Sequence, residues 1–148
     1  MGKSRDWVLK WIEEFVTQPN PVFGNMPPCP YARQAMVQNK VTVHELTHQE
    51  PDSNIWTRIE NTDFDAKDVV IMVAHKKRWT LRQCHRVVEQ LNQTFAHRDI
   101  MVMEDHPDQK ESVRSVTLNC GRYCLLLAQR RSKLMAASQQ LEKTDYYK

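Results

Sequence analysis

The chain has 148 residues, of which 41% are hydrophobic, so it has the size and composition of one domain with an ordinary buried core. Its 21 Lys and Arg residues are interspersed with 18 Asp and Glu residues for a net charge of +3, without the basic stripe that dominates nucleic-acid binders. No apolar run approaches the roughly 18 to 20 residues of a membrane span, and the amphipathic N-terminus differs from a secretory leader, so we expect a soluble, cytoplasmic protein with no membrane partner.

The N-terminal part of the chain predicts a helix followed by a stiff loop. Apolar residues recur at three- and four-residue steps from Trp7 onwards, which predicts an amphipathic helix over residues 1–18 with Ser4 as its cap. Residues 19–30, "PNPVFGNMPPCP", contain five prolines, and a backbone so rich in proline is neither helical nor centrally paired in a sheet. We therefore expect a loop that presents Cys29.

From residue 40 onwards the chain predicts a sheet and its packing helices, preceded by a short helix in "YARQAMVQN". The stretch "KVTVHEL" predicts a strand because three β-branched residues stand together in it. "DSNIWTRIEN" predicts a short helix capped by Asp52 or Ser53. The near-continuous apolar run of residues 68–75 predicts a strand that is covered on both faces.

The second half of the chain predicts a long helix between two strands. Thr80 and Gln83 form a capping box, and the apolar spacing after it predicts a helix that ends at Phe95. Residues 99–105 predict the next strand, and a strand-helix-strand unit of this length predicts parallel neighbours joined by a right-handed crossover. The polar segment "HPDQKESVRS" then predicts a loop.

The segment "VTLNCGRYCLLLAQ" fits two patterns, because its periodicity suits two short strands that turn at Gly121 or the start of a long helix. We favour a strand through Leu127 followed by a helix capped at Ser132. Together these elements predict a single α/β (α+β) domain with a mixed or antiparallel sheet of four strands in ferredoxin-like order. We expect the helices, including the first, to pack against one face of that sheet.

The first candidate site is "HELTH", in which His44 and His48 stand four residues apart with Glu45 beside the first. On a helix the two histidines share a face about 6 Å apart and can hold one zinc ion, while Glu45 activates its water. On a strand they stand roughly 13 Å apart and cannot meet on one ion. Because β-branched residues precede His44, we favour the strand, and a compact zinc hydrolase is the alternative.

The second candidate site combines the proline-rich loop with the later "HPD". Cys29 precedes a helix start at Pro30, where amide dipoles would activate the thiol as a nucleophile or redox centre; a packed apolar residue is the alternative. His106 follows a predicted strand, at the edge where open α/β sheets gather ligands. A pair of Cys29 and His106 oriented by Asp108 would suit thiolate chemistry, and an ordinary polar turn is the alternative.

Two basic clusters form the third candidate. They would make a phosphate or nucleic-acid patch if they faced the same side, and otherwise they are solvated surface. Their members are Lys76, Lys77, Arg78, Arg130 and Arg131.

The remaining cysteines give little functional signal. Cys84 lies on the apolar stripe of the long predicted helix, which indicates a core position. Cys120 and Cys124 would meet on a helix and stay apart on a strand, and alone they are a weak metal signal. Four cysteines in a chain of this size predict free thiols rather than a disulfide framework.

The order of these features resembles a family of short bacterial and phage proteins of unknown function, which carry a CPFA signature and a later HPD. The likeness consists of an early tryptophan-bearing helix, "PPCPYA", an apolar strand and the late "HPD", and it covers most of the chain. Tyr31 stands where the family has Phe, and Gln109 where an aromatic residue is expected. The resemblance marks Cys29, Pro30, His106 and Pro107 as family positions and implies a strand after the signature, but names no reaction.

Three functions therefore follow from the sequence. The leading one is a thiol-centred or ligand-binding site formed by the Cys29 loop and the His106 turn, with no cofactor and with a small molecule or a protein as partner. The second is the zinc-dependent hydrolase. The third is a non-enzymatic module that binds a protein or a nucleic acid through its basic clusters.

Overall fold

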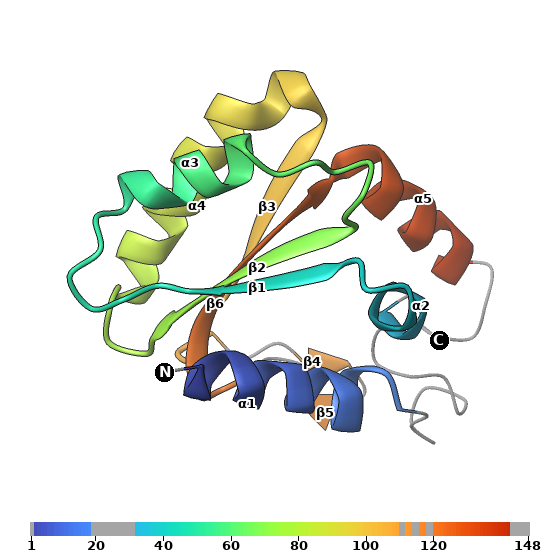
Figure 1. Cartoon of the computed structure of the whole chain (residues 1–148), viewed down its shortest axis with the longest axis horizontal. Helices are drawn as coiled ribbons and strands as arrows, with labels where there is room; N and C mark the ends of the chain where they lie inside the picture. The colour runs from blue at the N-terminus through green and yellow to red at the C-terminus, as the bar shows by residue number, and fades with distance from the viewer. Residues whose placement is uncertain (1, 19–31, 110–111, 114–115, 118–119, 143–148) are drawn as a thin grey trace.

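The computed structural model describes residues 2–18, 32–109, 112–113, 116–117 and 120–142. The chain forms one mixed four-stranded sheet with helices around it and a separate two-stranded ribbon (Figure 1). The elements in chain order are α1 Lys3–Trp11, the π-helical turn η1 Ile12–Val16, α2 Ala32–Val37, β1 Val41–Glu45, α3 Ser53–Glu60, β2 Val69–His75, α4 Leu81–Phe95, the 3-10 turn η3 Ala96–Arg98, β3 Ile100–Asp105, β4 Ser112–Val113, β5 Val116–Thr117, β6 Tyr123–Arg130 and α5 Arg131–Glu142.

The main sheet has the strand order β1-β2-β6-β3, which confirms the predicted α+β domain with a mixed four-stranded sheet. β1 pairs parallel with β2, while β6 pairs antiparallel with both β2 and β3. β2 and β3 are therefore parallel as predicted, but the prediction that they are neighbours is wrong, because β6 lies between them. The predicted ferredoxin-like order is not confirmed: the main sheet runs β-α-β-α-β-β along the chain, whereas that fold runs β-α-β-β-α-β.

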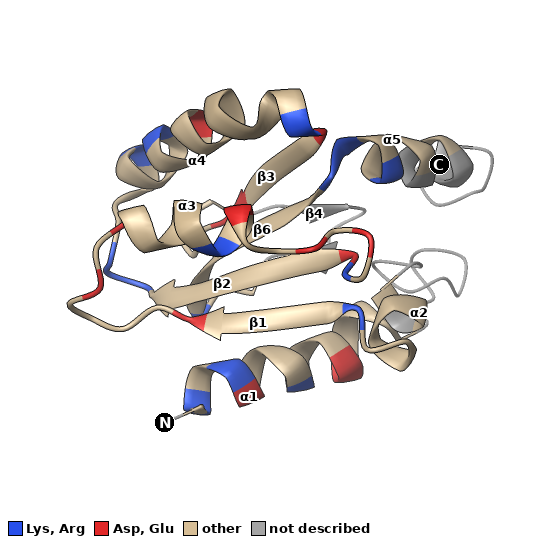
Figure 2. Ribbon diagram, turned by 45° about the horizontal axis from the view of Figure 1, so that its top comes forward, with Lys and Arg blue, Asp and Glu red and all other residues tan. Residues whose placement is uncertain are grey.

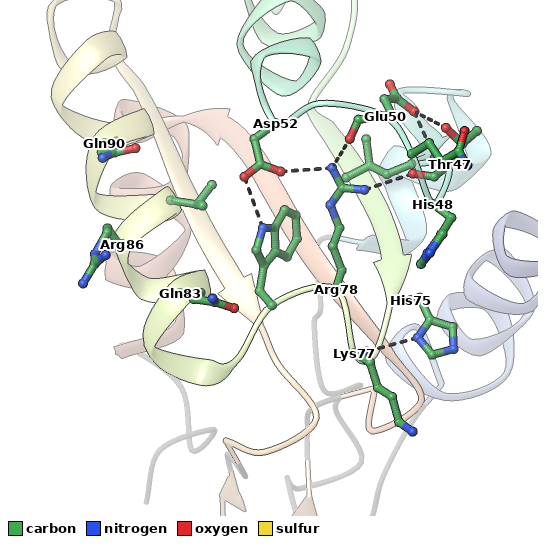
Figure 3. Close-up of a pocket in the computed structure, with 14 residues that line it drawn as sticks. Thr47, His48, Glu50, Asp52, His75, Lys77, Arg78, Gln83, Arg86 and Gln90 are labelled. Atoms are coloured by element: carbon green, nitrogen blue, oxygen red, sulfur yellow. Dashed lines mark hydrogen bonds and ion pairs between the residues drawn. The ribbon is translucent and has the colours of Figure 1, made fainter.

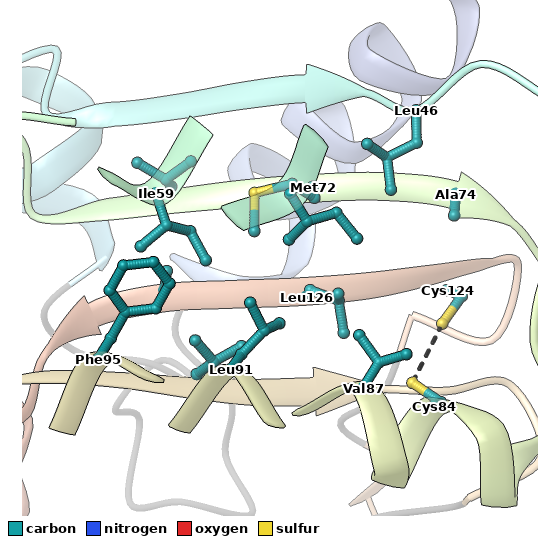
Figure 4. Close-up of a cluster of buried hydrophobic side chains, with 14 of the residues drawn as sticks. Leu46, Ile59, Met72, Ala74, Cys84, Val87, Leu91, Phe95, Cys124 and Leu126 are labelled. Atoms are coloured by element: carbon teal, nitrogen blue, oxygen red, sulfur yellow. Dashed lines mark hydrogen bonds between the residues drawn. The ribbon is translucent and has the colours of Figure 1, made fainter. Parts of the chain in front are cut away.

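The two faces of the sheet are covered by different helices. Alternate residues of β2 point to opposite faces, so Val70 and Met72 join the core with α3 and α4, while Ile71 and Val73 join a second cluster with Val8 of α1. Figure 1 shows α1 on the side of the sheet opposite α3 and α4, and Figure 4 shows the larger cluster. The prediction that all helices share one face is wrong, because a strand that is apolar on both faces needs cover on both.

Local signals placed several elements correctly. The capping box of α4 is present, with the Gln83 amide donating to the Thr80 hydroxyl and the Gln83 side chain accepting from the Thr80 amide.

β6 continues three residues past the predicted end at Leu127, and α5 follows it without a loop. Asp99 holds this junction, since its backbone carbonyl accepts the Arg131 amide and its carboxylate accepts the Ser132 amide and hydroxyl.

In the described part of the chain, no helix is both long and apolar enough to cross a membrane. The predicted polar loop after β3 is also more structured than expected, since it contains β4, which pairs with β5 in the small ribbon.

The carboxyl ends of β1, β2 and β3 all lie at one edge of the main sheet, because these three strands run in the same direction. This edge is where the candidate site lies.

Candidate functional site

The predicted zinc motif lies on a strand and on the turn after it. His44 belongs to β1, where it is in register with Met72 of β2, and His48 lies in the turn that follows. Burial and the nearby charge of Arg58 lower the pKa of His44. The helix on which the two histidines would share one ion is therefore absent from this segment, and no group of three or more metal-ligating side chains is found among the described residues.

Glu45, which would activate water in the zinc alternative, makes a structural contact with the N-terminus of α1. Its carboxylate accepts the backbone amides of Ser4 and Arg5, at 3.1 and 3.2 Å, and also the Ser4 hydroxyl. These amides are in the first turn of α1, where helical N–H groups have no partner within the helix. The prediction that Ser4 caps the helix is wrong, since Gly2 is the N-cap and the end of β1 supplies the carboxylate. The Ser4 hydrogen bond is the main cause that lowers the pKa of Glu45.

His106 is a core histidine that packs behind the strand ends. Its side chain is only 1% exposed, its Nε2 donates to the carbonyl of Trp79 at 2.8 Å, and its Nδ1 accepts the backbone amide of Asp108 at 3.1 Å. This geometry assigns the ring proton to Nε2. The Asp108 carboxylate, predicted to orient the ring, is exposed and lies 3.9 Å from Nδ1. Cys29 lies outside the described residues, so its pairing with His106 stays a prediction.

The two basic clusters do not form one patch. β2 and β6 are antiparallel, with Val69 opposite Gln129 and His75 opposite Tyr123, so Lys76 and Lys77 follow one end of β2 and Arg130 and Arg131 lie at the other. Six residues of strand, or about 20 Å, separate the two clusters. The condition for a joint patch, that both clusters face the same side, is therefore not met, because the antiparallel strands that carry them end at opposite ends of the sheet.

A pocket of about 650 Å³ opens beyond the carboxyl ends of β1 and β2, between the loops that follow these strands and residues 83–90 of α4 (Figure 3). Its floor contains the buried apolar side chains of Leu46, Trp79 and Val87. The carboxyl edge of parallel strands is where open α/β sheets bind ligands, and the volume falls in the range of about 300 to 1,000 Å³ typical of small-molecule sites. We take this pocket as the candidate functional site.

Polar side chains form two rims around the apolar floor. One rim belongs to α4, where steps of three and four residues place Gln83, Arg86 and Gln90 on one face of the helix. Figure 3 shows these residues along α4, with Trp79 between them and the side chains of His48 and His75. The opposite rim consists of His48, His75 and Lys77.

Arg78 fixes the wall between the two rims. Its guanidinium donates to the backbone carbonyls of Thr47 and Glu50 and to the carboxylate of Asp52, so one side chain after β2 holds the whole loop after β1. Asp52 also accepts the Trp79 indole N–H at 3.4 Å, and the Arg78 guanidinium lies 5.0 Å from the centre of the Trp79 ring. The Asp52 carboxylate therefore binds the side chains of Arg78 and Trp79. Asp52 is the N-cap residue of α3, but its side chain makes no capping hydrogen bond to that helix.

Both carboxylates that line the pocket are already paired with cations. Glu50 lies 2.8 Å from Arg58, and Asp52 lies 3.0 Å from Arg78. Burial raises the pKa of Glu50, but hydrogen bonds from Thr47 and Asn54 and the charge of Arg58 outweigh it, so the net shift is downward and Glu50 is a carboxylate. By contrast, Lys77 and Arg86 have no carboxylate within 4.0 Å among the residues that the structure describes.

The sequence predicted only part of this site. Lys77 and Arg78 were candidates as members of a basic cluster, and His48 as a zinc ligand, but the α4 rim was missed. Ligands gather beyond the carboxyl ends of parallel strands, and this rule points to the residues after β1 and β2 as well as to His106 after β3. Once these strands are placed together with α4 beside them, Arg86 follows as an exposed residue of α4 next to the buried Val87, at the border of the pocket.

None of the three described cysteines lines the pocket. Cys84 of α4 and Cys124 of β6 are fully buried, and their sulfur atoms are 3.6 Å apart (Figure 4). The hydrogen bond with Cys84, together with burial, raises the pKa of Cys124, and burial raises that of Cys120. Cys84 is the core residue that the helical spacing predicted, and neither raised thiol favours nucleophilic chemistry at neutral pH.

Comparison of the chain with models of protein families, with curated proteins and with solved structures found no match. The resemblance to the CPFA family therefore stays a prediction, and the chemistry of the pocket is the basis for a functional proposal.

Proposed function

We propose that the protein binds a small organic anion in the pocket at the carboxyl ends of β1 and β2. The observation that carries the proposal is the distribution of charge around the pocket. Lys77 and Arg86 line it from opposite rims, and its two carboxylates, on Glu50 and Asp52, already have Arg partners. A ligand with negative charge would supply the counter-charge that the protein leaves out.

The rims and the floor select different parts of a ligand. The planar guanidinium of Arg86 suits two-point binding of a carboxylate or a phosphate, and the Lys77 ammonium adds a point charge. Leu46 and Val87 favour an apolar portion beneath the charged group. Trp79 is not a stacking surface for a ring, because the Arg78 guanidinium lies over its face.

The lining favours binding over covalent catalysis. Among the described residues that line the pocket there is no Cys or Ser, and the hydroxyl of Thr47 lies 3.4 Å from the carboxylate of Glu50, its hydrogen-bond acceptor. This pocket is a different site from the ligand-binding site that the sequence predicts at the Cys29 loop and the His106 turn. Thiol chemistry at Cys29 remains a separate prediction.

Calorimetric titration with inorganic phosphate, benzoate and thymidine monophosphate tests the proposal. We expect at least one probe to bind the wild type, and Lys77→Ala with Arg86→Ala to weaken it by about tenfold or more, since charge-assisted contacts contribute about 1.5 to 3 kcal/mol each. The matched control is Arg98→Ala with Arg131→Ala, which removes the same charge at the opposite end of the sheet and should change affinity by less than about twofold. Equal losses in the two double variants, or no binding of any probe, would overturn the proposal.

A further inference from the structure

The basic surface continues from the pocket around the strand ends toward α1. Lys76 directly follows β2, and His75 at the end of β2 is opposite the first residue of β6, so Arg122 lies beside this strand end. On the other side, the Arg5 amide donates to Glu45 at the end of β1. Arg5, Lys76 and Arg122 therefore lie at the same edge of the sheet as the pocket.

Arg122 is held in place by aromatic rings. Its guanidinium lies 5.7 Å from the centre of the Trp7 ring and 5.8 Å from that of Tyr123. The two rings pack edge to face, with centroids 5.5 Å apart, and join α1 to β6. A guanidinium held in this way loses less conformational freedom when it binds a phosphate than a free one does.

The cations at this edge form no ion pair with a carboxylate in the described part of the chain. For Arg5, Lys76, Lys77, Arg86 and Arg122, no side-chain nitrogen lies within 4.0 Å of a described carboxylate. The Glu45 carboxylate at the end of β1 is bound to the backbone amide of Arg5. Figure 2 shows Lys and Arg in the first turns of α1, in the loop between β2 and α4 and on α4, all at the end to which the arrows of β1 and β2 point. We call this set the carboxyl-edge cations: Arg5, Lys76, Lys77, Arg86 and Arg122.

We propose that the carboxyl-edge cations bind a single strand of nucleic acid, with one phosphate group in the pocket between Lys77 and Arg86 and the following ones along Lys76, Arg122 and Arg5. This inference rests on the proposed function, because the pocket supplies the first anion site. The cations extend across the α4 layer, the sheet and the α1 layer, and layers of this kind stack at about 10 Å, so the path is roughly 20 Å long. A mononucleotide would fill only its first part.

The chemistry favours nucleic acid over the other polyanions. Binders of single strands combine cations that follow the phosphates with aromatic and guanidinium groups, and this edge has Trp7 and Tyr123 beside Arg122. A lipid surface is disfavoured, because the exposed large apolar side chains of the described residues are Val37, Met103 and Met135, none of which belongs to this edge. An acidic peptide would use the same cations, and the comparison with poly-glutamate below separates it from a nucleic acid.

The experiment compares thymidine monophosphate with a fluorescent oligothymidylate of twelve nucleotides on the full chain. We expect the oligomer to bind the wild type at least about tenfold more tightly than the monomer does. Arg5→Ala with Arg122→Ala should abolish this gain and leave the affinity for the monomer within about twofold. The slope of log affinity against log salt should fall by about 1.4, since each lost phosphate contact contributes about 0.7 on a single strand.

Several outcomes would overturn the inference. If monomer and oligomer bind equally, the pocket binds an anion but the edge does not bind a strand, so the proposed function survives alone. A poly-glutamate chain of equal charge that binds as tightly as the oligomer would indicate an acidic polypeptide partner instead. Lys76→Glu is a second test in case the double variant does not fold, because the Lys76 side chain is exposed and makes no described contact. Unchanged oligomer affinity in Lys76→Glu would also contradict the inference.

Discussion

Replacement of Arg78 by alanine should destabilise the protein more than any change on the surrounding rims. The side chain is 12% exposed and donates hydrogen bonds to the carbonyls of Thr47 and Glu50 and to the carboxylate of Asp52. The two carbonyl bonds contribute about 1 kcal/mol each. The ion pair contributes up to about 1 kcal/mol, because the Asp52 side chain is 44% exposed and water replaces part of the lost interaction. The expected loss in free energy of unfolding is therefore about 3 kcal/mol.

Urea denaturation followed by circular dichroism measures this loss, and the melting temperature should fall by about 6 to 12 °C for a domain of this size. Lys77→Ala is the matched control, since Lys77 is the exposed neighbour whose side chain makes no described hydrogen bond, and it should change stability by less than about 0.5 kcal/mol. Arg78→Lys should lose about half as much as Arg78→Ala, because one ammonium cannot reach all three acceptors. A value for Arg78→Ala within about 0.5 kcal/mol of the wild type would refute the role of Arg78 as the anchor of the pocket wall.

Three further predictions test the structure around the site. The pKa of Glu45 is lowered in the folded protein, so the charged carboxylate adds to the free energy of unfolding above the ordinary pKa of a glutamate, and this addition is lost as the pH falls. Acid denaturation curves should therefore show a smaller loss of stability in Glu45→Gln than in the wild type. Asn92→Ala should cost about 1 to 3 kcal/mol in urea denaturation, because the amide makes two hydrogen bonds to the backbone of Val102 on the edge strand β3; a neutral effect would contradict this account. Maleimide labelling followed by peptide mass analysis should modify Cys84 and Cys124 only at the rate of unfolding, since both are fully buried, and rapid labelling of the native protein would show that this core opens.

The elements that the sequence predicted correctly are those with local signals. β2 is an apolar run of strand length, α4 has a capping box within four residues, and β1 has three adjacent β-branched residues. Each of these patterns acts through neighbouring residues, so the rest of the fold does not alter it. The strand at His44 follows for the same reason, and with it the distance that separates the two histidines of the zinc motif.

The features that the sequence did not predict depend on contacts between distant segments. β6 lies between β2 and β3 and forms an antiparallel ladder with each of them, and no local pattern shows which strand lies between two others. Glu45 matches a catalytic motif, yet its carboxylate accepts backbone amides in the first turn of α1, about 40 residues away in the chain. His106 was correctly expected at a strand end, but only the Trp79 carbonyl, 27 residues distant, shows that the ring is a core element.

Nuclear magnetic resonance titration of the isotopically labelled chain with thymidine monophosphate tests the central claim most directly, because it reports the position of binding as well as its strength. The account predicts that the largest amide shifts fall on Thr47, His48, Lys77 and Arg86, which surround the pocket. Shifts concentrated at the other end of the sheet, around Asp65 and Arg130, with the pocket amides unchanged, would contradict it.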